Sequence, residues 1–150
     1  MVYLEKCFIG YPTTLLTWDA ANDACSNSGG DLASYTSLAE SQKIQSVTGG
    51  VFSWVGLSDR YYEGQYMWTD LSTILYFNWS PNYPTNLVTN DCVLMDSSGA
   101  LRDVSCTSTQ AYVCQYYVQF GKEFDRHNVF LFLFFISFFF FLSFFFFFFF

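Results

Sequence analysis

Positive charge and histidine are scarce in this chain. Its 150 residues include 6 lysines and arginines and 1 histidine against 13 acidic residues, which gives a formal net charge of −7. A nucleic-acid partner would need a basic surface opposite its phosphates, and no run of basic residues occurs anywhere in the sequence. The composition therefore predicts no nucleic-acid partner.

The patterns of a catalytic centre are also missing. A nucleophilic serine or cysteine needs a base beside it, and the one histidine, His127, follows the last cysteine. A glycine-rich phosphate loop is absent, because Gly29-Gly30 and Gly49-Gly50 are typical of helix ends. We predict that the protein is not an enzyme.

The cysteines lack the close spacing of a zinc site. The segments between successive cysteines hold 17, 66, 13 and 7 residues, whereas zinc sites made from cysteine alone use closely spaced pairs. Disulfides fit these spacings better and indicate an oxidising compartment. The five cysteines are Cys7, Cys25, Cys92, Cys106 and Cys114.

The N-terminus lacks a secretory signal. The first residues, MVYLEKCFIG, have neither the basic segment nor the apolar segment of a signal peptide. Since disulfides need an oxidising compartment, we expect the natural start of the protein to lie upstream of Met1.

Phenylalanine is concentrated at the C-terminal end, where 15 of the 20 phenylalanines follow Val129. The segment Val129–Phe150 has the length and apolarity of a membrane-spanning helix. Its low complexity, with nothing polar after it, fits equally well the translation of non-coding sequence, and both interpretations stay open. We divide the chain into a domain over 1–118, a linker over 119–128 and this tract over 129–150, through which the protein could contact a membrane.

Two helices are predicted in the first half of the domain. Thr17 can cap the first helix, and apolar residues follow at helical spacing up to Gly29-Gly30. Ser37 begins the second helix and forms a capping box with Glu40, and Gly49-Gly50 ends it.

β-structure surrounds the helices. We expect Tyr3–Ile9 and Leu15-Leu16 to be short strands around a turn at Gly10-Tyr11-Pro12. After the helices, segments rich in aromatic and β-branched residues occur at 52–59, 65–70, 74–79, 91–95, 99–106 and 110–117. Helices followed by strands predict an α+β fold. The stretch from Leu71 to Thr89 has little regular pattern, and such long loops usually carry function.

An ordered set of motifs runs through these elements. They are W-x-x-A-x-x-x-C from Trp18, GGDLAS from Gly29, WVGLSD from Trp54, WTD from Trp68, NW from Asn78, and the closing NDC, RDVSC and YVC. Over roughly Lys6 to Gln115 this set resembles the C-type lectin-like domain. The resemblance implies an α+β C-type lectin-like fold, with two helices, short antiparallel sheets and a long loop region, stabilised by disulfides.

The resemblance also implies the cysteine pairing. In that family the first and last of four cysteines pair, as do the middle two, which gives Cys25–Cys114 and Cys92–Cys106. Cys7 matches the second member of an extra pair found in longer members, whose partner would lie upstream of Met1. A free thiol or an intermolecular bridge at Cys7 is the alternative.

Three tryptophans have two interpretations. Trp54, Trp68 and Trp79 could stack on the apolar face of a sugar. They lie in strands of alternating pattern, and the resemblance assigns Trp54 and its neighbours to the interior, so we expect core positions.

The resemblance raises the question of calcium. In sugar-binding members, oxygens from a Glu-Pro-Asn-type motif, an acidic residue before a cysteine and a Trp-Asn-Asp motif hold one Ca²⁺, which accepts two sugar hydroxyls. Here the same positions are Tyr83-Pro84-Thr85, Asn90 and Leu101-Arg102-Asp103. Only Asp103 and Asn90 remain as candidate calcium ligands.

Arg102 places a positive charge where the ion would bind, and it would repel a divalent cation. We expect Arg102 to pair with Asp103 or Asp91 and to replace the ion. No cofactor is therefore expected, and calcium is the only one that the resemblance would allow.

The function predicted from these residues is recognition of a glycan or protein ligand through the long loop. The candidate ligand-binding residues are Tyr83, Thr85, Asn90, Arg102 and Asp103. The domain is expected outside the cell, secreted or anchored to a membrane. The alternatives are a calcium-dependent carbohydrate-binding lectin and a structural or interaction domain with no soluble ligand.

Overall fold

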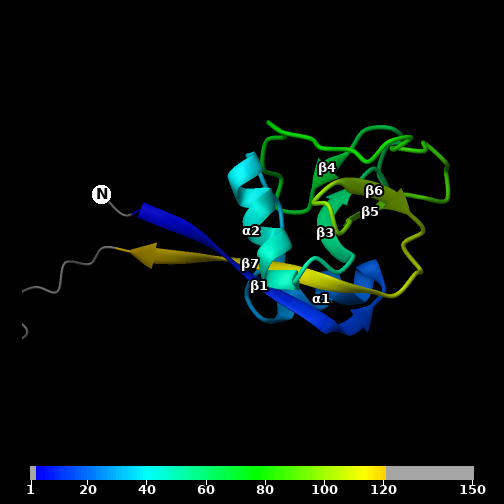
Figure 1. Ribbon diagram of the computed structural model, residues 1–150. Helices are drawn as coiled ribbons and strands as arrows, with labels where there is room; N and C mark the ends of the chain where they lie inside the picture. Colours follow the sequence, from blue (N-terminus) through cyan, green and yellow to red (C-terminus); the bar gives the residue numbers. More distant parts are fainter. Residues whose placement is uncertain (1–2, 121–150) are drawn as a thin grey trace, which may run out of the picture. The chain divides into compact units, whose positions relative to one another are not determined.

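The computed structural model describes residues 3–120, and the compact unit discussed below spans Glu5–Val118. The elements, shown in Figure 1, are β1 (Tyr3–Leu16), α1 (Trp18–Asn27), β2 (Asp31–Leu32), α2 (Leu38–Thr48), β3 (Ser53–Ser58), β4 (Met67–Trp68), β5 (Cys92–Met95), β6 (Leu101–Val104) and β7 (Gln110–Phe120). The tract 129–150 and most of the expected linker lie outside the described residues. Within 3–120 no helix is long and apolar enough to span a bilayer.

Both predicted helices are present with the predicted caps. The Thr17 hydroxyl accepts a hydrogen bond from the first turn of α1, and the Ser37 hydroxyl accepts one from the backbone N–H of Glu40. Gly49 ends α2 in the left-handed conformation, at φ 65°, which costs a glycine little. The Glu40 carboxylate accepts from the backbone N–H of Thr36 at 2.7 Å, one residue earlier than a capping box requires.

The strands form one mixed sheet rather than separate antiparallel ones. Its order is β1-β7-β3-β5-β6, with β2 also pairing with β7 and β4 with β3. β3 and β7 run parallel, with Trp54 opposite Tyr112. A parallel pair needs a long connection, and the segment containing β4, the long loop and the β5–β6 hairpin provides it.

Two expectations about strands are corrected. The expected turn at Gly10-Tyr11-Pro12 is wrong, because β1 continues from Tyr3 to Leu16. Gly10 is needed for a close approach instead, since a Cβ there would lie 2.3 Å from the carbonyl oxygen of Val47, and Pro12 is tolerated because β1 is an edge strand. Residues 74–79 form no strand, and only Trp79 makes a bridge, to Leu101.

The interior consists of two hydrophobic clusters. One contains Ile44 of α2 with Val55 and Leu57, and the other contains Trp18 of α1 with Trp54. Successive residues of β3 alternate between the clusters because strand side chains point to opposite faces. Trp54 and Trp68 are fully buried, as predicted, and Trp79 is half-buried against the first cluster.

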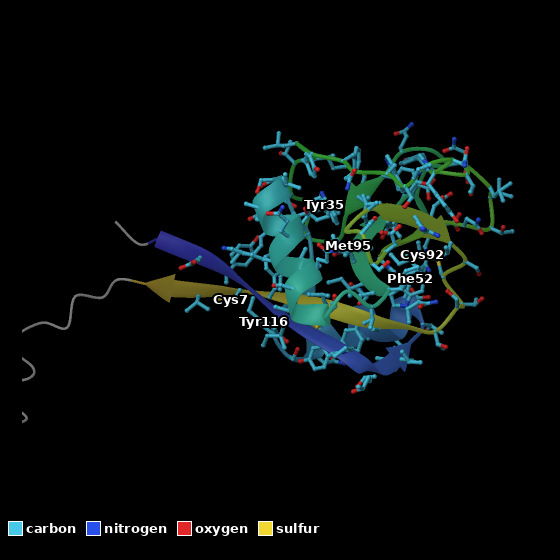
Figure 2. The ribbon with its side chains drawn as sticks, viewed as in Figure 1. Cys7, Tyr35, Phe52, Cys92, Met95 and Tyr116 are labelled. Atoms are coloured by element: carbon cyan, nitrogen blue, oxygen red, sulfur yellow. A yellow bond between two sulfur atoms is a disulfide. The ribbon has the colours of Figure 1, made fainter. Side chains whose placement is uncertain are left out.

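Two disulfides stabilise this arrangement. Cys25–Cys114 joins α1 to β7 across 89 residues, and Cys92–Cys106 joins β5 to the segment after β6. These are the pairs that the resemblance implies. Cys7, on β1 in Figure 2, is the one cysteine of residues 3–120 outside a disulfide, and its side chain is half-exposed.

Candidate functional site

The loop between β4 and β5 lies alongside β6. The backbone N–H of Ser80 donates to the Leu101 carbonyl oxygen at 2.9 Å, and the Leu101 N–H donates to the carbonyl oxygen of Asn78 at 2.7 Å. Figure 1 shows the loop passing along the β5–β6 side of the sheet. The loop is therefore attached to the sheet next to the residues predicted to bind a ligand.

Three of the predicted residues meet at Asp103. This carboxylate is fully buried, and the backbone N–H of Thr85 donates to both of its oxygens at 2.8 Å. The Thr85 hydroxyl donates to Oδ2 at 2.6 Å and accepts from the Asn90 amide at 3.2 Å. The loop thus supplies hydrogen-bond donors to Asp103 where a cation would otherwise be required.

Arg102 has a different partner from the predicted ones. Its Nε donates to Asp96 Oδ2 at 2.9 Å and to the Ser80 hydroxyl at 3.3 Å. The expectation that Arg102 pairs with Asp103 or Asp91 is wrong. Neighbouring residues of a strand point to opposite faces, so Arg102 and Asp103 of β6 are directed apart.

Asp96 is buried in a ring of hydrogen-bond donors. Besides Arg102, these are the Ser80 hydroxyl, the backbone N–H and hydroxyl of Ser98, and the backbone N–H of Ala100. Burial alone would raise the pKa of Asp96, but the hydrogen bonds from Ser80, Ser98 and Arg102 outweigh it and hold the pKa well below its ordinary value. Asp96 is consequently charged, its oxygens are hydrogen-bonded, and it fixes the position of Arg102. Sequence reasoning missed it, although β6 alternation and the tight β5–β6 connection could have indicated it.

The guanidinium of Arg102 contacts two aromatic rings. Its central carbon is 5.4 Å from the ring centroid of Phe52 and 5.4 Å from that of Tyr83. The arginine side chain remains 35% exposed. Neither Nη nitrogen is paired with an acidic residue within 3–120, and a hydrogen bond with the Tyr83 hydroxyl contributes to raising the Arg102 pKa, after the larger effect of Asp96. Tyr83, a predicted site residue, therefore contacts Arg102 and does not act as a metal ligand in this arrangement.

These residues do not fit the calcium ion that the resemblance would allow. The oxygens of Asp103 are hydrogen-bonded to Thr85, and the tyrosine and arginine at the other positions form a cation–aromatic contact. Ca²⁺ takes six to eight oxygen ligands. Within the part of the chain that the structure describes, no three His, Cys, Asp or Glu side chains are placed to hold a metal.

A second acidic feature lies near the loop and was not predicted. Asp59 is buried, with Oδ2 accepting from the Gly64 N–H at 2.9 Å and Oδ1 without a partner among residues 3–120. Desolvation, and then the charges of Asp59, Asp91 and Asp103, raise the pKa of Glu63. The carboxylates around Glu63 therefore repel one another.

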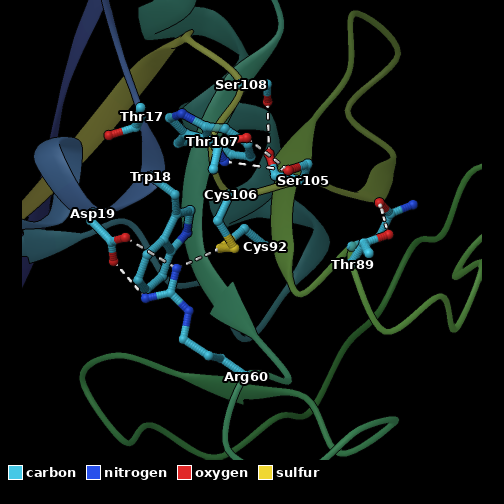
Figure 3. Close-up of a disulfide and its surroundings, with 12 residues drawn as sticks. Thr17, Trp18, Asp19, Arg60, Thr89, Cys92, Ser105, Cys106, Thr107 and Ser108 are labelled. Atoms are coloured by element: carbon cyan, nitrogen blue, oxygen red, sulfur yellow. Dashed lines mark hydrogen bonds and ion pairs between the residues drawn. A yellow bond between two sulfur atoms is a disulfide. The ribbon is translucent and has the colours of Figure 1, made fainter.

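Arg60 provides a contrast to Arg102. Its two Nη nitrogens donate to the two carboxylate oxygens of Asp19, at 2.5 and 3.2 Å, and its guanidinium lies 5.1 Å from the Trp18 ring (Figure 3). Arg60 and these two residues line a surface pocket of about 370 Å³ between α1 and β4. The terminal nitrogens of Arg60 are thus already used within the protein.

Several large apolar side chains of the long loop are exposed. Leu71 is 81% exposed, and Leu75 and Val88 are similarly open to solvent. This feature is also absent from the sequence-based predictions.

The sequence of the chain is similar to a known domain family and to proteins that contain it. The family described as Lectin C-type domain matches residues 14–116 of the chain. The versican core protein of Homo sapiens is 37% identical over 103 residues, which cover 66% of this chain but only 3% of the relative. The chain thus spans a small part of that much longer protein.

Two solved structures are similar over most of their own length. A calcium-independent type II antifreeze protein is 31% identical with a TM-score of 0.71, covering 75% of this chain and 88% of that one. The C-type carbohydrate-recognition domain of cow CD23, solved in the presence of an oligosaccharide, is 30% identical with a TM-score of 0.71, covering 77% and 91%.

Proposed function

Since the chain belongs to the C-type lectin domain family, we propose that it is a recognition module that binds a glycan at its long-loop face without a high-affinity calcium ion. The face consists of Tyr83, Thr85, Asn90 and Arg102, together with Phe52, and the buried Asp103 holds Thr85 in place beneath it. Its role is binding, and the family is generally non-catalytic.

The observation that carries this proposal is the state of Asp103. It is the one anionic ligand kept in register with the calcium motif, and both of its oxygens accept hydrogen bonds from Thr85. A calcium ion would have to displace these bonds and would gain no carboxylate from Tyr83 or Asn90. Since calcium affinity depends on the number of charged ligands, the site favours the ion-free state.

Two relatives support the proposal from different sides. The similar antifreeze protein is described as calcium-independent, so a domain of this fold can do without the ion. The similar CD23 domain was solved with an oligosaccharide, which supports a glycan as the class of ligand here.

A protein ligand is the second candidate, and the exposed apolar side chains of the loop favour it. Leu71, Leu75 and Val88 offer a surface that a protein partner could cover. A glycan would use polar groups and aromatic faces instead, so the two candidates predict different sensitive residues.

We place the domain outside the cell, secreted or anchored. The support is its two disulfides, which persist in oxidising compartments. Anchoring would depend on residues 129–150, and the test is whether the full chain partitions into membranes while residues 1–120 stay soluble.

A glycan array tests the proposal directly. Residues 1–120 suffice, because Glu5–Val118 is a compact unit that contains both disulfides and both hydrophobic clusters. Oxidised protein should bind the same glycans with millimolar calcium and with chelator. Tyr83→Ala should weaken binding, whereas Tyr117→Ala, at the far end of β7, should not. Binding that chelator abolishes would contradict calcium independence, and an array without binding would contradict the glycan ligand.

A further inference from the structure

The two terminal nitrogens of Arg102 pair with no acidic residue of 3–120 and have only the Tyr83 hydroxyl beside them as an acceptor. We propose that they bind the anionic group of an acidic glycan, a carboxylate or a sulfate, at the long-loop face. This inference rests on the proposed function and specifies its ligand class.

The two arginines of residues 3–120 differ in this respect. Arg60 is paired with an aspartate and lies over an aromatic ring, as Arg102 does, but both Nη nitrogens of Arg60 donate to Asp19. Arg102 is attached to Asp96 through Nε alone. The planar pair of Nη groups, which matches a carboxylate or sulfate in a bidentate manner, is left over only at Arg102.

The terminal nitrogens of Arg102 are also held in position. The hydrogen bonds from Nε to Asp96 and to Ser80 fix one edge of the guanidinium, and the rings of Phe52 and Tyr83 flank it at 5.4 Å. An arginine restrained in this way loses little further conformational entropy when a ligand binds. The remaining edge of the group belongs to a side chain that is 35% exposed, so a ligand can reach it.

Asp96 leaves the terminal N–H groups of Arg102 able to bind an anion. Its carboxylate accepts hydrogen bonds from Ser80, Ser98 and Ala100 in addition to Arg102. These neutral donors stabilise the Asp96 charge without removing it, so Arg102 and Asp96 form a neutral pair. The terminal N–H groups of Arg102 keep their hydrogen-bonding capacity within that pair.

The surrounding charge limits the kind of anion. The chain has a net charge of −7, and the buried Asp96 carboxylate is bound to Nε of Arg102. At physiological salt, a single anionic group feels little repulsion from protein charges more than about 8 Å away. A polyanion would bring several of its charges within that distance of acidic residues and would be repelled. The ligand class is therefore a glycan with one acidic group, with its sugar ring against Phe52, which is 40% exposed.

The test uses a glycan array in chelator that pairs each sialylated or sulfated glycan with its neutral parent. Wild-type residues 1–120 should bind the anionic member at least about tenfold more tightly, as expected for charge-assisted hydrogen bonds. Arg102→Gln should lower the affinity for the anionic member to that for its neutral parent, so that the preference disappears. Arg102→Lys keeps the positive charge beside Asp96 but lacks the planar pair of Nη groups, so it should lose most of the preference for the anionic glycan. If Arg102→Gln does not fold, the lysine variant tests the proposal instead.

Arg60→Gln is the matched control, because it removes the same charge and should keep the preference. Preference for sialylated members alone identifies a carboxylate, preference for sulfated members alone identifies a sulfate, and either supports the proposal. Equal binding of paired members, or equal losses in the Arg102 and Arg60 variants, overturns it while the proposed glycan recognition stands. Binding of acidic peptides with no glycan bound would contradict both.

Discussion

Thr85 is bound to Asp103 by three hydrogen bonds. Its backbone N–H lies 2.8 Å from each carboxylate oxygen, and its hydroxyl lies 2.6 Å from Oδ2. The contact joins the long loop to β6 and satisfies a fully buried charge. It therefore couples the geometry of the candidate site to the stability of the domain.

Removing the Thr85 hydroxyl should destabilise the domain. Thr85→Val keeps the side-chain shape but takes one hydrogen bond from a buried carboxylate, and we expect a loss of about 1.5 kcal/mol in the free energy of unfolding. Thr107→Val is the control, since the exposed Thr107 hydroxyl bonds only to the Ser105 hydroxyl, and it should change stability by less than about 0.5 kcal/mol. Denaturant unfolding measures both, and equal effects would argue against the Thr85–Asp103 contact.

Calcium should not stabilise the domain through the long loop. An ion at 100 times its dissociation constant would add about 2.7 kcal/mol to the free energy of unfolding, so thermal melts with millimolar calcium and with chelator should overlay. Arg102→Asn should gain no calcium response, because Tyr83 and Asn90 still supply no carboxylate.

If calcium did shift the melting temperature, the ion could bind either at the long loop or at the carboxylates around Glu63. Two variants distinguish these sites. Loss of the shift in Asp103→Asn would show that the long-loop residues hold the ion and would contradict the proposed function. Loss in Asp59→Asn, with the shift kept in Asp103→Asn, would assign the ion to the carboxylates around Glu63 and leave the long-loop site ion-free.

Asp96 should make the domain sensitive to acid. Its pKa is lower in the folded protein than in the unfolded chain, so its stabilising effect is complete above the unfolded value of about 4 and is lost as pH falls toward the folded value. Asp96→Asn should therefore flatten the dependence of unfolding free energy on pH below about 4. A variant with the same acid profile as the wild type would show that Asp96 is not the responsible group.

The two disulfides should contribute unequally. In the chain-entropy model Cys25–Cys114, which closes the longer loop, contributes about 4 to 5 kcal/mol, and Cys92–Cys106 contributes about 3 kcal/mol. Serine replacement of each pair, followed by denaturant unfolding, measures the difference. Peptide mapping of the oxidised protein that found Cys92 bonded to Cys114 would contradict the fold.

The sequence by itself determined the features that depend on neighbouring residues. Thr17 and Ser37 cap helices because a hydroxyl oxygen is placed next to free backbone N–H groups, and Gly49 ends α2 because glycine adopts positive φ at little cost. The ordered motifs and cysteines also sufficed for the family and for the disulfide pairs. They further indicated that the calcium motif is degenerate, since that depends only on residue types.

Only the tertiary structure decided which side chains meet. The partner of Arg102 depends on strand alternation and on the β5–β6 register, which together direct it to Asp96 and Ser80 and away from Asp103. The continuity of β1 through Pro12 depends on its edge position and on the approach of α2 to Gly10. Such contacts join residues far apart in the chain, and local sequence patterns carry no information about the distances between them.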